Sequence, residues 1–184
     1  MILLGVTGSI AAYKSAEILR LLSKAGEDVH VVMTQAAARF VGPLTFQALS
    51  GHPVMTDPLD PDAYQMPHLA LAEKVSAVLV APATADTLSR LSAGRADDLI
   101  AAIVLALPRA SKGKSGAPVV IAPAMHQSMW LHPATQGNVK TLKTYGYRFI
   151  GPEKGPLGRA GDEGIGRMAD PTAIVDYVLK LRAR

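Results

Sequence analysis

The chain has 184 residues, 49% of them hydrophobic and 18% charged, which favours one folded domain with a sizeable core and excludes a disordered chain. It contains no cysteine, so disulfides, thiolate metal sites and cysteine nucleophiles are excluded. The formal net charge is +4, yet the basic residues are scattered except at 109–114 and 180–184, where no aromatic residues are interleaved, which argues against nucleic-acid binding.

The apolar runs of the sequence are short. Residues 76–83, one of the longest, have the length of a strand and fall well short of a membrane span. The first residues lack the basic segment of a secretory signal and lead directly into a strand–turn–helix pattern. We therefore expect a cytoplasmic protein with no membrane partner, and the basic surplus suits an anionic small-molecule substrate.

Short apolar runs alternate with longer helical patterns, which predicts βαβ units and an α/β fold with a parallel sheet. In chain order, the predicted elements are strand 2–6, helix 10–24, strand 28–33, helices 34–40, 43–49 and 68–74, strand 76–81, helices 86–92 and 97–107, strand 118–122, helix 134–145, strand 147–150 and helix 172–181. Residues 51–67 are expected to form a surface excursion and residues 109–116 a polar loop. Residues 151–166 contain six glycines and should be mobile. No internal repeat is visible, so residues 1–184 form one predicted domain.

Ligands of open parallel sheets bind outside the carboxyl ends of the strands, near the point where the strand order reverses. Four predicted loops leave such strand ends. In the first, GVTGSIAA, small residues around Gly8, Ser9 and Ile10 let backbone N–H groups approach a phosphate at a helix N-terminus. An ordinary turn with Ser9 as a helix cap is the alternative. The glycine spacing differs from the G-x-G-x-x-G dinucleotide fingerprint.

The second and third loops also combine small residues with hydroxyl groups. Thr34 follows the second strand, where its hydroxyl suits both a phosphate and the N-cap of a helix. Phe40 either packs on a flat ring or belongs to the core. After the third strand, Thr84 and Thr87 in APATADT supply hydrogen bonds beside a planar ligand, unless they only cap the next helix.

Histidines mark the fourth loop and the predicted helix 68–74. In APAMHQSMW, which follows a buried strand, His126 stands between two methionines and ahead of the only tryptophan. Such residues are unusual in an exposed loop, and a buried histidine needs hydrogen-bond partners for its ring nitrogens. We therefore expect this loop to contact a ligand. His68 begins the predicted helix, and such a histidine taken alone is more often structural.

Together these segments resemble the homo-oligomeric flavin-containing cysteine decarboxylases, most closely the phosphopantothenoylcysteine decarboxylases. The resemblance covers most of the chain and rests on GVTGSIAAYK, MTQAAARF, HLAL, VLVAPATADTLSRLSAGRADDL, IAPAMHQSMWLHPATQGNV and GDEGIGRM. It implies a Rossmann-like three-layer α/β/α fold with FMN at the subunit contacts of a trimer or a dodecamer. It also implies decarboxylation of 4′-phosphopantothenoylcysteine to 4′-phosphopantetheine in coenzyme A biosynthesis, with a separately encoded phosphopantothenate-cysteine ligase as partner.

The resemblance assigns roles residue by residue. His68 matches the catalytic histidine, His126 matches the residue that holds the substrate carboxylate, and Met125 and Arg167 match other substrate contacts. The matching cofactor contacts are Gly8, Ser9, Ile10, Thr34, Phe40, Thr84, Ala85, Asp86, Thr87 and Ala124. Residues 151–167 resemble a flap that closes over the substrate. No metal ligand is implied, and we expect no metal site.

Three features depart from the family pattern. His126 and Asp86 stand where the family usually has asparagine, which places an imidazole at the substrate and a negative charge near the flavin. The flap cysteine is absent, since the chain reads Gly158-Arg159-Ala160 there. That thiol has the role of protonating the enethiolate product. Either another group, such as water or His126, donates the proton, or the product is the oxidised enethiol, as in the peptidyl-cysteine decarboxylases.

Other functions remain open on this sequence. An oxidative peptidyl-cysteine decarboxylase and a flavin reductase use the same scaffold. A non-catalytic flavin-binding regulatory subunit would need no flap cysteine. His68 weighs against the regulatory alternative, because a chain without catalysis has no chemical need for that histidine.

Overall fold

A parallel sheet forms the centre of the protein. The computed structural model describes residues 1–56, 67–108, 116–159 and 161–182. Within this part of the chain, five parallel strands lie in the order β2-β1-β3-β4-β5. Their bounds are β1 Ile2–Val6, β2 Val29–Met33, β3 Ala77–Ala83, β4 Val119–Pro123 and β5 Arg148–Phe149. Most of the excursion predicted at 51–67 and of the loop predicted at 109–116 lies outside the described residues.

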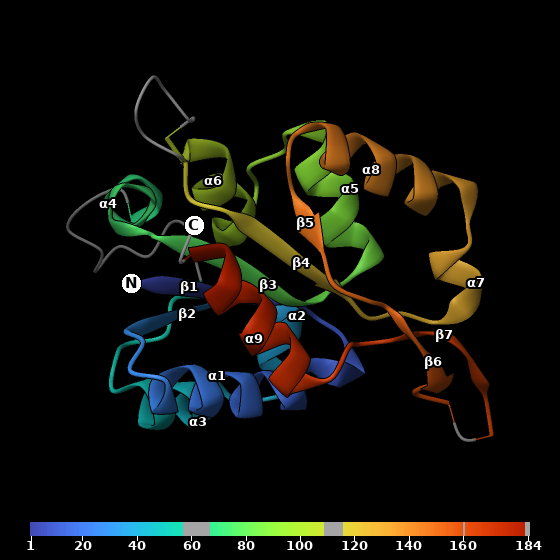
Figure 1. Ribbon diagram of the computed structural model, residues 1–184, viewed down its shortest axis with the longest axis horizontal. Coiled ribbons are helices and arrows are strands. Elements are labelled where there is room, and N and C mark those ends of the chain that lie inside the picture. The colour runs from blue at the N-terminus through green and yellow to red at the C-terminus, as the bar shows by residue number, and fades with distance from the viewer. Residues whose placement is uncertain (57–66, 109–115, 160, 183–184) are drawn as a thin grey trace.

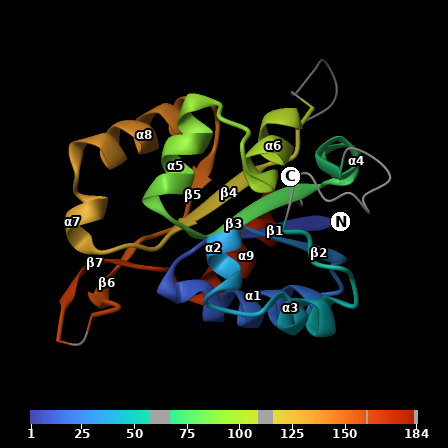
Figure 2. The same cartoon turned by 180° about the vertical axis from the view of Figure 1, so that it is seen from behind.

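Helices cover both faces of the sheet, as Figure 1 and the reverse view in Figure 2 show. One face carries α1 (Lys14–Lys24), α3 (Pro43–Ser50) and α9 (Pro171–Arg182). The other face carries α4 (Pro67–Lys74), α5 (Ala85–Ala93), α6 (Leu99–Ala106) and α8 (Pro133–Thr144). The prediction of a Rossmann-like three-layer α/β/α fold is therefore confirmed.

The core explains why the strands read as continuous apolar runs. Every residue of β1 is buried, with Leu4 in the core on the side of α1 and α9 and Leu3 in the core on the side of α4 and α6. Successive strand residues point to opposite faces, and here both faces are covered, so both need apolar side chains. None of the described helices is long and apolar enough to cross a membrane.

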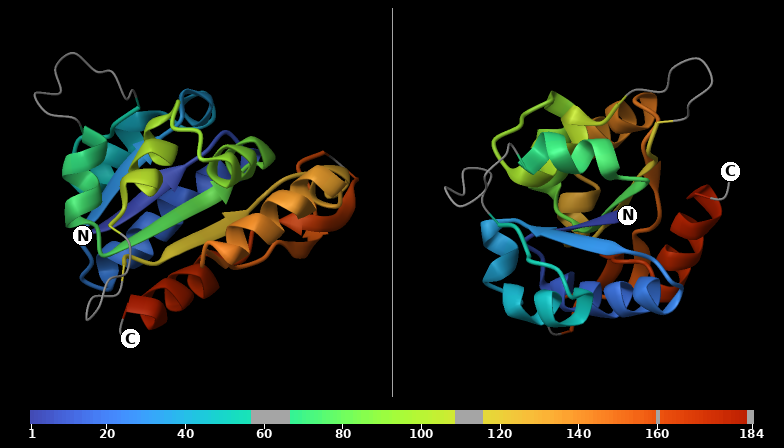
Figure 3. Two further views of the ribbon diagram at one scale, coloured as in Figure 1. Left: turned by 90° about the horizontal axis from the view of Figure 1, so that it is seen from above. Right: turned by 90° about the vertical axis from the view of Figure 1, so that its left-hand side faces the viewer.

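The strand order reverses between β1 and β3, because β2 lies on one side of β1 while β4 and β5 continue beyond β3. Figure 3 shows the twisted sheet and its helical layers from two further directions. The sequence predicted a single helix at 10–24, after β1. The structure has a 3₁₀ turn there, η1 (Ile10–Tyr13), which leads directly into α1. The short α2 (Gln35–Ala38) follows β2.

The glycine-rich segment before α9 forms an antiparallel hairpin of β6 (Glu153–Pro156) and β7 (Glu163–Arg167), where the sequence predicted no strands. These strands lack an apolar alternation, which is why they were missed. The Met125 amide donates to the Gly166 carbonyl at 3.0 Å and joins the hairpin to the loop after β4. The one-turn helix α7 (Gln127–Trp130) in that loop was also not predicted.

Candidate functional site

A cavity of about 1010 Å³ opens at the carboxyl ends of β1, β3 and β4 and extends to the hairpin. This volume lies at the upper end of the range for small-molecule sites, about 300–1,000 Å³. Most of the residues singled out from the sequence line it. They are Gly8, Ser9, Ile10, Thr34, Thr84, Ala85, Asp86, Thr87, Ala124, Met125, His126 and Arg167.

Two of the predicted site residues do not line this cavity within one copy of the chain. His68 is half-buried on α4, on the far side of the sheet from α1. Phe40 follows α2 and is 51% exposed, so the alternative that placed it in the core is wrong. A role for either residue at the cavity therefore remains a prediction.

The loop after β1 is fixed to the loops after β3 and β4 by two hydroxyl groups. Ser9 caps η1, since its Oγ accepts a hydrogen bond from the Ala11 amide, and it lies 3.2 Å from the Ala124 carbonyl, to which it donates. Thr7 Oγ donates to the Pro82 carbonyl at 2.7 Å and accepts from the Thr84 amide at 3.1 Å. The cap predicted for Ser9 is confirmed. Thr7 was missed, although it stands inside the GVTGS turn.

Close packing explains the glycine at position 8. A Cβ on Gly8 would lie 2.5 Å from the Cβ of Ala36, so any side chain there would push the β1 loop away from α2. Thr34 caps α2, with its Oγ accepting from the Ala37 amide at 3.1 Å. The N-terminal ends of η1 and α2 therefore face the same cavity, and each presents backbone N–H groups that favour an anion.

The loop after β3 begins α5 with an N-cap. Thr84 Oγ accepts from the Thr87 amide at 3.2 Å and lies 3.0 Å from the Thr87 hydroxyl. The predicted capping role of this loop is thus confirmed, and both threonines still line the cavity. Ala85, between them, has a small side chain that leaves room for a planar ligand.

A cluster of charges, not foreseen from the sequence, borders the same side of the cavity. Arg90 Nε donates to Asp86 Oδ2 at 2.8 Å, and the Arg90 guanidinium also pairs with Asp97 and lies near Asp98. The hydrogen bonds to Asp86 and Asp97 raise the pKa of Arg90 above its ordinary value, and the bond from Arg90 lowers the pKa of Asp97. The negative charge of Asp86, which departs from the family pattern, is therefore paired with a cation that Asp86 shares with Asp97 and Asp98. Only its i,i+4 spacing to Arg90 could have revealed this pair.

The hairpin carries two acids, Asp162 and Glu153, which pair with two residues predicted to contact the substrate. His126 caps α7 through Nδ1, which accepts from the Ser128 amide, so the ring proton is on Nε2. This Nε2 lies 3.3 Å from Asp162 Oδ2. Arg167 Nη2 donates to Glu153 Oε2 at 2.8 Å. The imidazole of His126 and the guanidinium of Arg167 are thus each paired with a carboxylate of the protein. A carboxylate or phosphate group of a ligand could take the place of either one.

The strand order 2-1-3-4-5 is that of the flavodoxin-like class of doubly wound α/β proteins, and the cavity lies at the β1/β3 switch point of this sheet. The sequence model described as Flavoprotein matches residues 1–183. The chain therefore belongs to the flavoprotein family.

Individual relatives agree with this assignment. The coenzyme A biosynthesis bifunctional protein CoaBC of Haemophilus influenzae is 46% identical over 181 residues, which cover 96% of this chain and 43% of that protein. The chain thus spans about two fifths of the length of this relative. The crystal structure of the FMN-dependent cysteine decarboxylase SpaF is 31% identical, with a TM-score of 0.81 and coverage of 100% of this chain and 97% of SpaF. A mutant PPC decarboxylase complexed with pantothenoylaminoethenethiol is 26% identical, with a TM-score of 0.83 and coverage of 100% of this chain and 98% of that one.

Proposed function

We propose that this protein is an FMN-dependent decarboxylase that converts 4′-phosphopantothenoylcysteine to 4′-phosphopantetheine in coenzyme A biosynthesis. The observation that carries the proposal is the 46% identity to a coenzyme A biosynthesis protein over 96% of the chain. The similarity to a PPC decarboxylase bound to pantothenoylaminoethenethiol supports the same substrate class. The similarity to SpaF, an FMN-dependent cysteine decarboxylase, supports the cofactor and the reaction type.

The residues at the cavity fit FMN. Gly8 and the helix ends at Ser9 and Thr34 would hold its phosphate, and the segment Thr84–Thr87 with Ala124 would line the flavin ring. Only a residue without a side chain fits at position 8, which leaves the backbone N–H groups of that loop open to the phosphate. Bound FMN supplies a reversible hydride acceptor, which makes loss of CO₂ from a cysteine carboxylate chemically accessible.

The chain's own residues would then bind and enclose the substrate. The Nε2–H of His126, now directed at Asp162, would donate to the substrate carboxylate. Arg167, now paired with Glu153, would hold a phosphate group of the substrate. The hairpin and Met125 border the same cavity and would exclude water around the reacting carbon.

Completion of the site by a neighbouring copy accounts for the two residues that do not line the cavity. Ile10 and Tyr13, which border the cavity, are 59% and 61% exposed. We propose a homo-oligomer, a trimer or a dodecamer as the resemblance implies, in which a second copy covers these side chains. That copy would bring His68 and Phe40 to the cavity, with His68 as the catalytic histidine.

The bifunctional relative also suggests a partner for this protein. The relative from Haemophilus influenzae is named a bifunctional protein, and this chain matches less than half of it. A phosphopantothenate-cysteine ligase, on the same or a separate chain, would supply the substrate. The cytoplasmic location expected from the sequence stays a prediction.

An anaerobic incubation of the purified protein with 4′-phosphopantothenoylcysteine tests the reaction. Formation of 4′-phosphopantetheine and CO₂, with the flavin absorbance unchanged at the end, is the expected result. A product two hydrogens lighter, with persistent loss of the flavin absorbance, would instead identify an oxidative cysteine decarboxylase. The absence of cysteine from the chain favours that second candidate. No product and no spectral change would contradict the proposed substrate and leave a flavin reductase or a regulatory subunit.

The charge cluster gives a prediction about cofactor affinity. Replacing Arg90 by alanine leaves Asp86, Asp97 and Asp98 without their shared cation beside an anionic ligand. We expect the Arg90→Ala variant to bind FMN about ten-fold more weakly, measured by fluorescence titration of the apoprotein at low salt. In contrast, Asp86→Asn removes a negative charge and should bind FMN at least as tightly as the unchanged protein. Equal affinity of Arg90→Ala and the unchanged protein would refute this role for Arg90.

A further inference from the structure

A second cluster of chemically active side chains lies at the opposite end of the sheet from the cavity. Asp28 immediately precedes β2, His30 lies within β2, and His52 follows α3. Since β2 is the edge strand and these residues mark its amino end, the cluster is separate from the cavity at the carboxyl ends. The proposed decarboxylase function does not use it.

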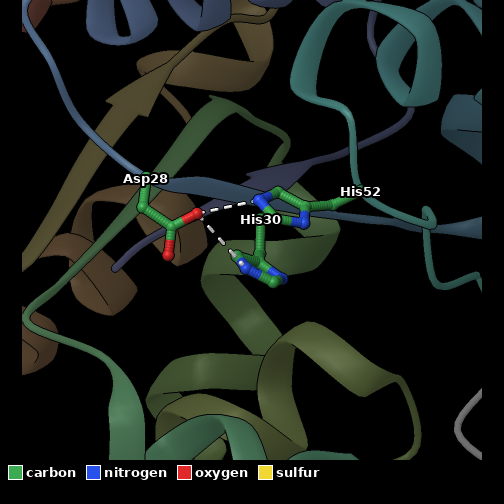
Figure 4. A group of neighbouring side chains, drawn as sticks. All are labelled: Asp28, His30 and His52. Atoms are coloured by element: carbon green, nitrogen blue, oxygen red, sulfur yellow. Dashed lines mark hydrogen bonds and ion pairs between the residues drawn. The ribbon is translucent and has the colours of Figure 1, made fainter.

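Both imidazoles of this cluster are directed at one carboxylate oxygen, as Figure 4 shows. Nε2 of His52 lies 2.8 Å and Nε2 of His30 lies 3.5 Å from Oδ1 of Asp28. The two rings stack, with centroids 3.9 Å apart and planes at 18°. One ligand atom from each residue lies within 4.8 Å of the other two. Three donor atoms, two from the start of β2 and one from the segment after α3, therefore lie close together.

We propose that Asp28, His30 and His52 bind one Zn²⁺ ion, with water in the fourth position. Two imidazole nitrogens and one carboxylate oxygen form a donor set that this ion accepts. Around a tetrahedral zinc ion with bonds of about 2.0–2.1 Å, neighbouring ligand atoms lie about 3.4 Å apart. The two distances to Asp28, 2.8 and 3.5 Å, lie on either side of that separation. The two rings are stacked, so at least one imidazole would have to rotate before both nitrogens could point at one ion.

The surroundings set a moderate affinity for the ion. The side chain of Asp28 is 53% exposed and that of His52 is 36% exposed, so the ion and its water have a path from solvent. The positive charge of Lys74 acts on His30 and opposes a further cation. With one anionic ligand against this charge, we expect a dissociation constant in the micromolar range.

Zinc at this point would fasten the segment after α3 to the edge of the sheet. Met55 already pairs with β2, since its carbonyl accepts from the Met33 amide at 2.9 Å and its amide donates to the Val31 carbonyl at 3.3 Å. His52 lies three residues before Met55, so the ion would hold the start of the same segment. The expected role is structural: the ion would keep in place the segment that pairs with the edge strand β2.

The test uses tag-free, FMN-loaded protein freed of metals by EDTA and then titrated calorimetrically with ZnCl₂. One Zn²⁺ per chain should bind, and Co²⁺ in its place should give the visible absorption of a four-coordinate site. Zn²⁺ at 100-fold excess over its dissociation constant should raise the Tm by roughly 5–10 °C. Asp28→Asn and His52→Ala should each weaken binding at least ten-fold and lose the Tm increase.

His132→Asn is the matched control, because it removes a histidine elsewhere and asparagine retains the N-cap of α8. It should bind Zn²⁺ as the unchanged protein does. Flavin content and circular dichroism of each variant establish that it is folded. The proposal is overturned if no saturable binding occurs, or if folded His52→Ala binds Zn²⁺ as tightly as His132→Asn. Neither result depends on decarboxylase activity.

Discussion

The variant His68→Ala is expected to lose turnover of 4′-phosphopantothenoylcysteine by about 10²–10⁴-fold, the range that a positioned acid–base group contributes. Its FMN content should stay unchanged, because the loops after β1, β2 and β3 that would hold FMN are unaltered. Turnover is measured as product mass per flavin, so that differences in cofactor loading do not enter the comparison. His132→Asn, at a residue that does not line the cavity, serves as the control and should retain full activity.

Co-expression of two inactive variants distinguishes a shared site from a site within one copy. If a second copy supplies His68, mixed oligomers of His68→Ala and His126→Ala contain some sites with both histidines. Random mixing should then restore up to about a quarter of the activity per site. No recovery, with mixed oligomers demonstrated by mass, would contradict the shared site. Full activity of His68→Ala alone would refute its catalytic role.

The central fold could be predicted from the sequence because strands buried on both faces have a simple pattern, a short apolar run. β1 to β4 are covered on both faces, so each appears as a short apolar run bounded by turn residues. The loops that follow these strands could be recognised by their small and hydroxyl-bearing residues, and twelve of the predicted site residues line one cavity. These loops meet in one site because they all follow the carboxyl ends of strands near the switch point of a parallel sheet.

What could not be predicted depends on contacts between distant residues or between copies. The pairing of Arg90 with Asp97 joins α5 to the loop before α6, and no local sequence pattern predicts this ion pair. The sequence indicated no metal site, although Asp28 and His30 are two residues apart and so project to the same side of β2. The third member of that cluster, His52, reaches it only through the fold. The catalytic role predicted for His68 stays a prediction, because within one copy this residue does not line the cavity.

The replacement of Gly166 by alanine is expected to have the other large effect. A Cβ at this position would lie 2.1 Å from the Met125 carbonyl oxygen, which is backbone and cannot rotate away. The hairpin would have to leave the loop after β4, and the bond between the Met125 amide and the Gly166 carbonyl, 3.0 Å long, would break. The adjacent bond from the Ile165 amide to Gln127 Oε1, 2.9 Å long, depends on the same contact.

We expect Gly166→Ala to lower kcat/KM by about 100-fold, since a displacement of about 1 Å in a positioning element has an effect of that size. FMN binding should persist, because the loops after β1 and β3 do not depend on this contact. Gly137→Ala is the control: nothing lies within 4 Å of its added Cβ, and alanine in α8 should stabilise the fold by about 0.5–1 kcal/mol. If Gly166→Ala retained the kcat/KM of the unchanged protein, the docked hairpin would have no part in catalysis. Because Asp162 and Arg167 are carried by this hairpin, retained activity would also mean that catalysis does not depend on where these two residues lie relative to the loop after β4.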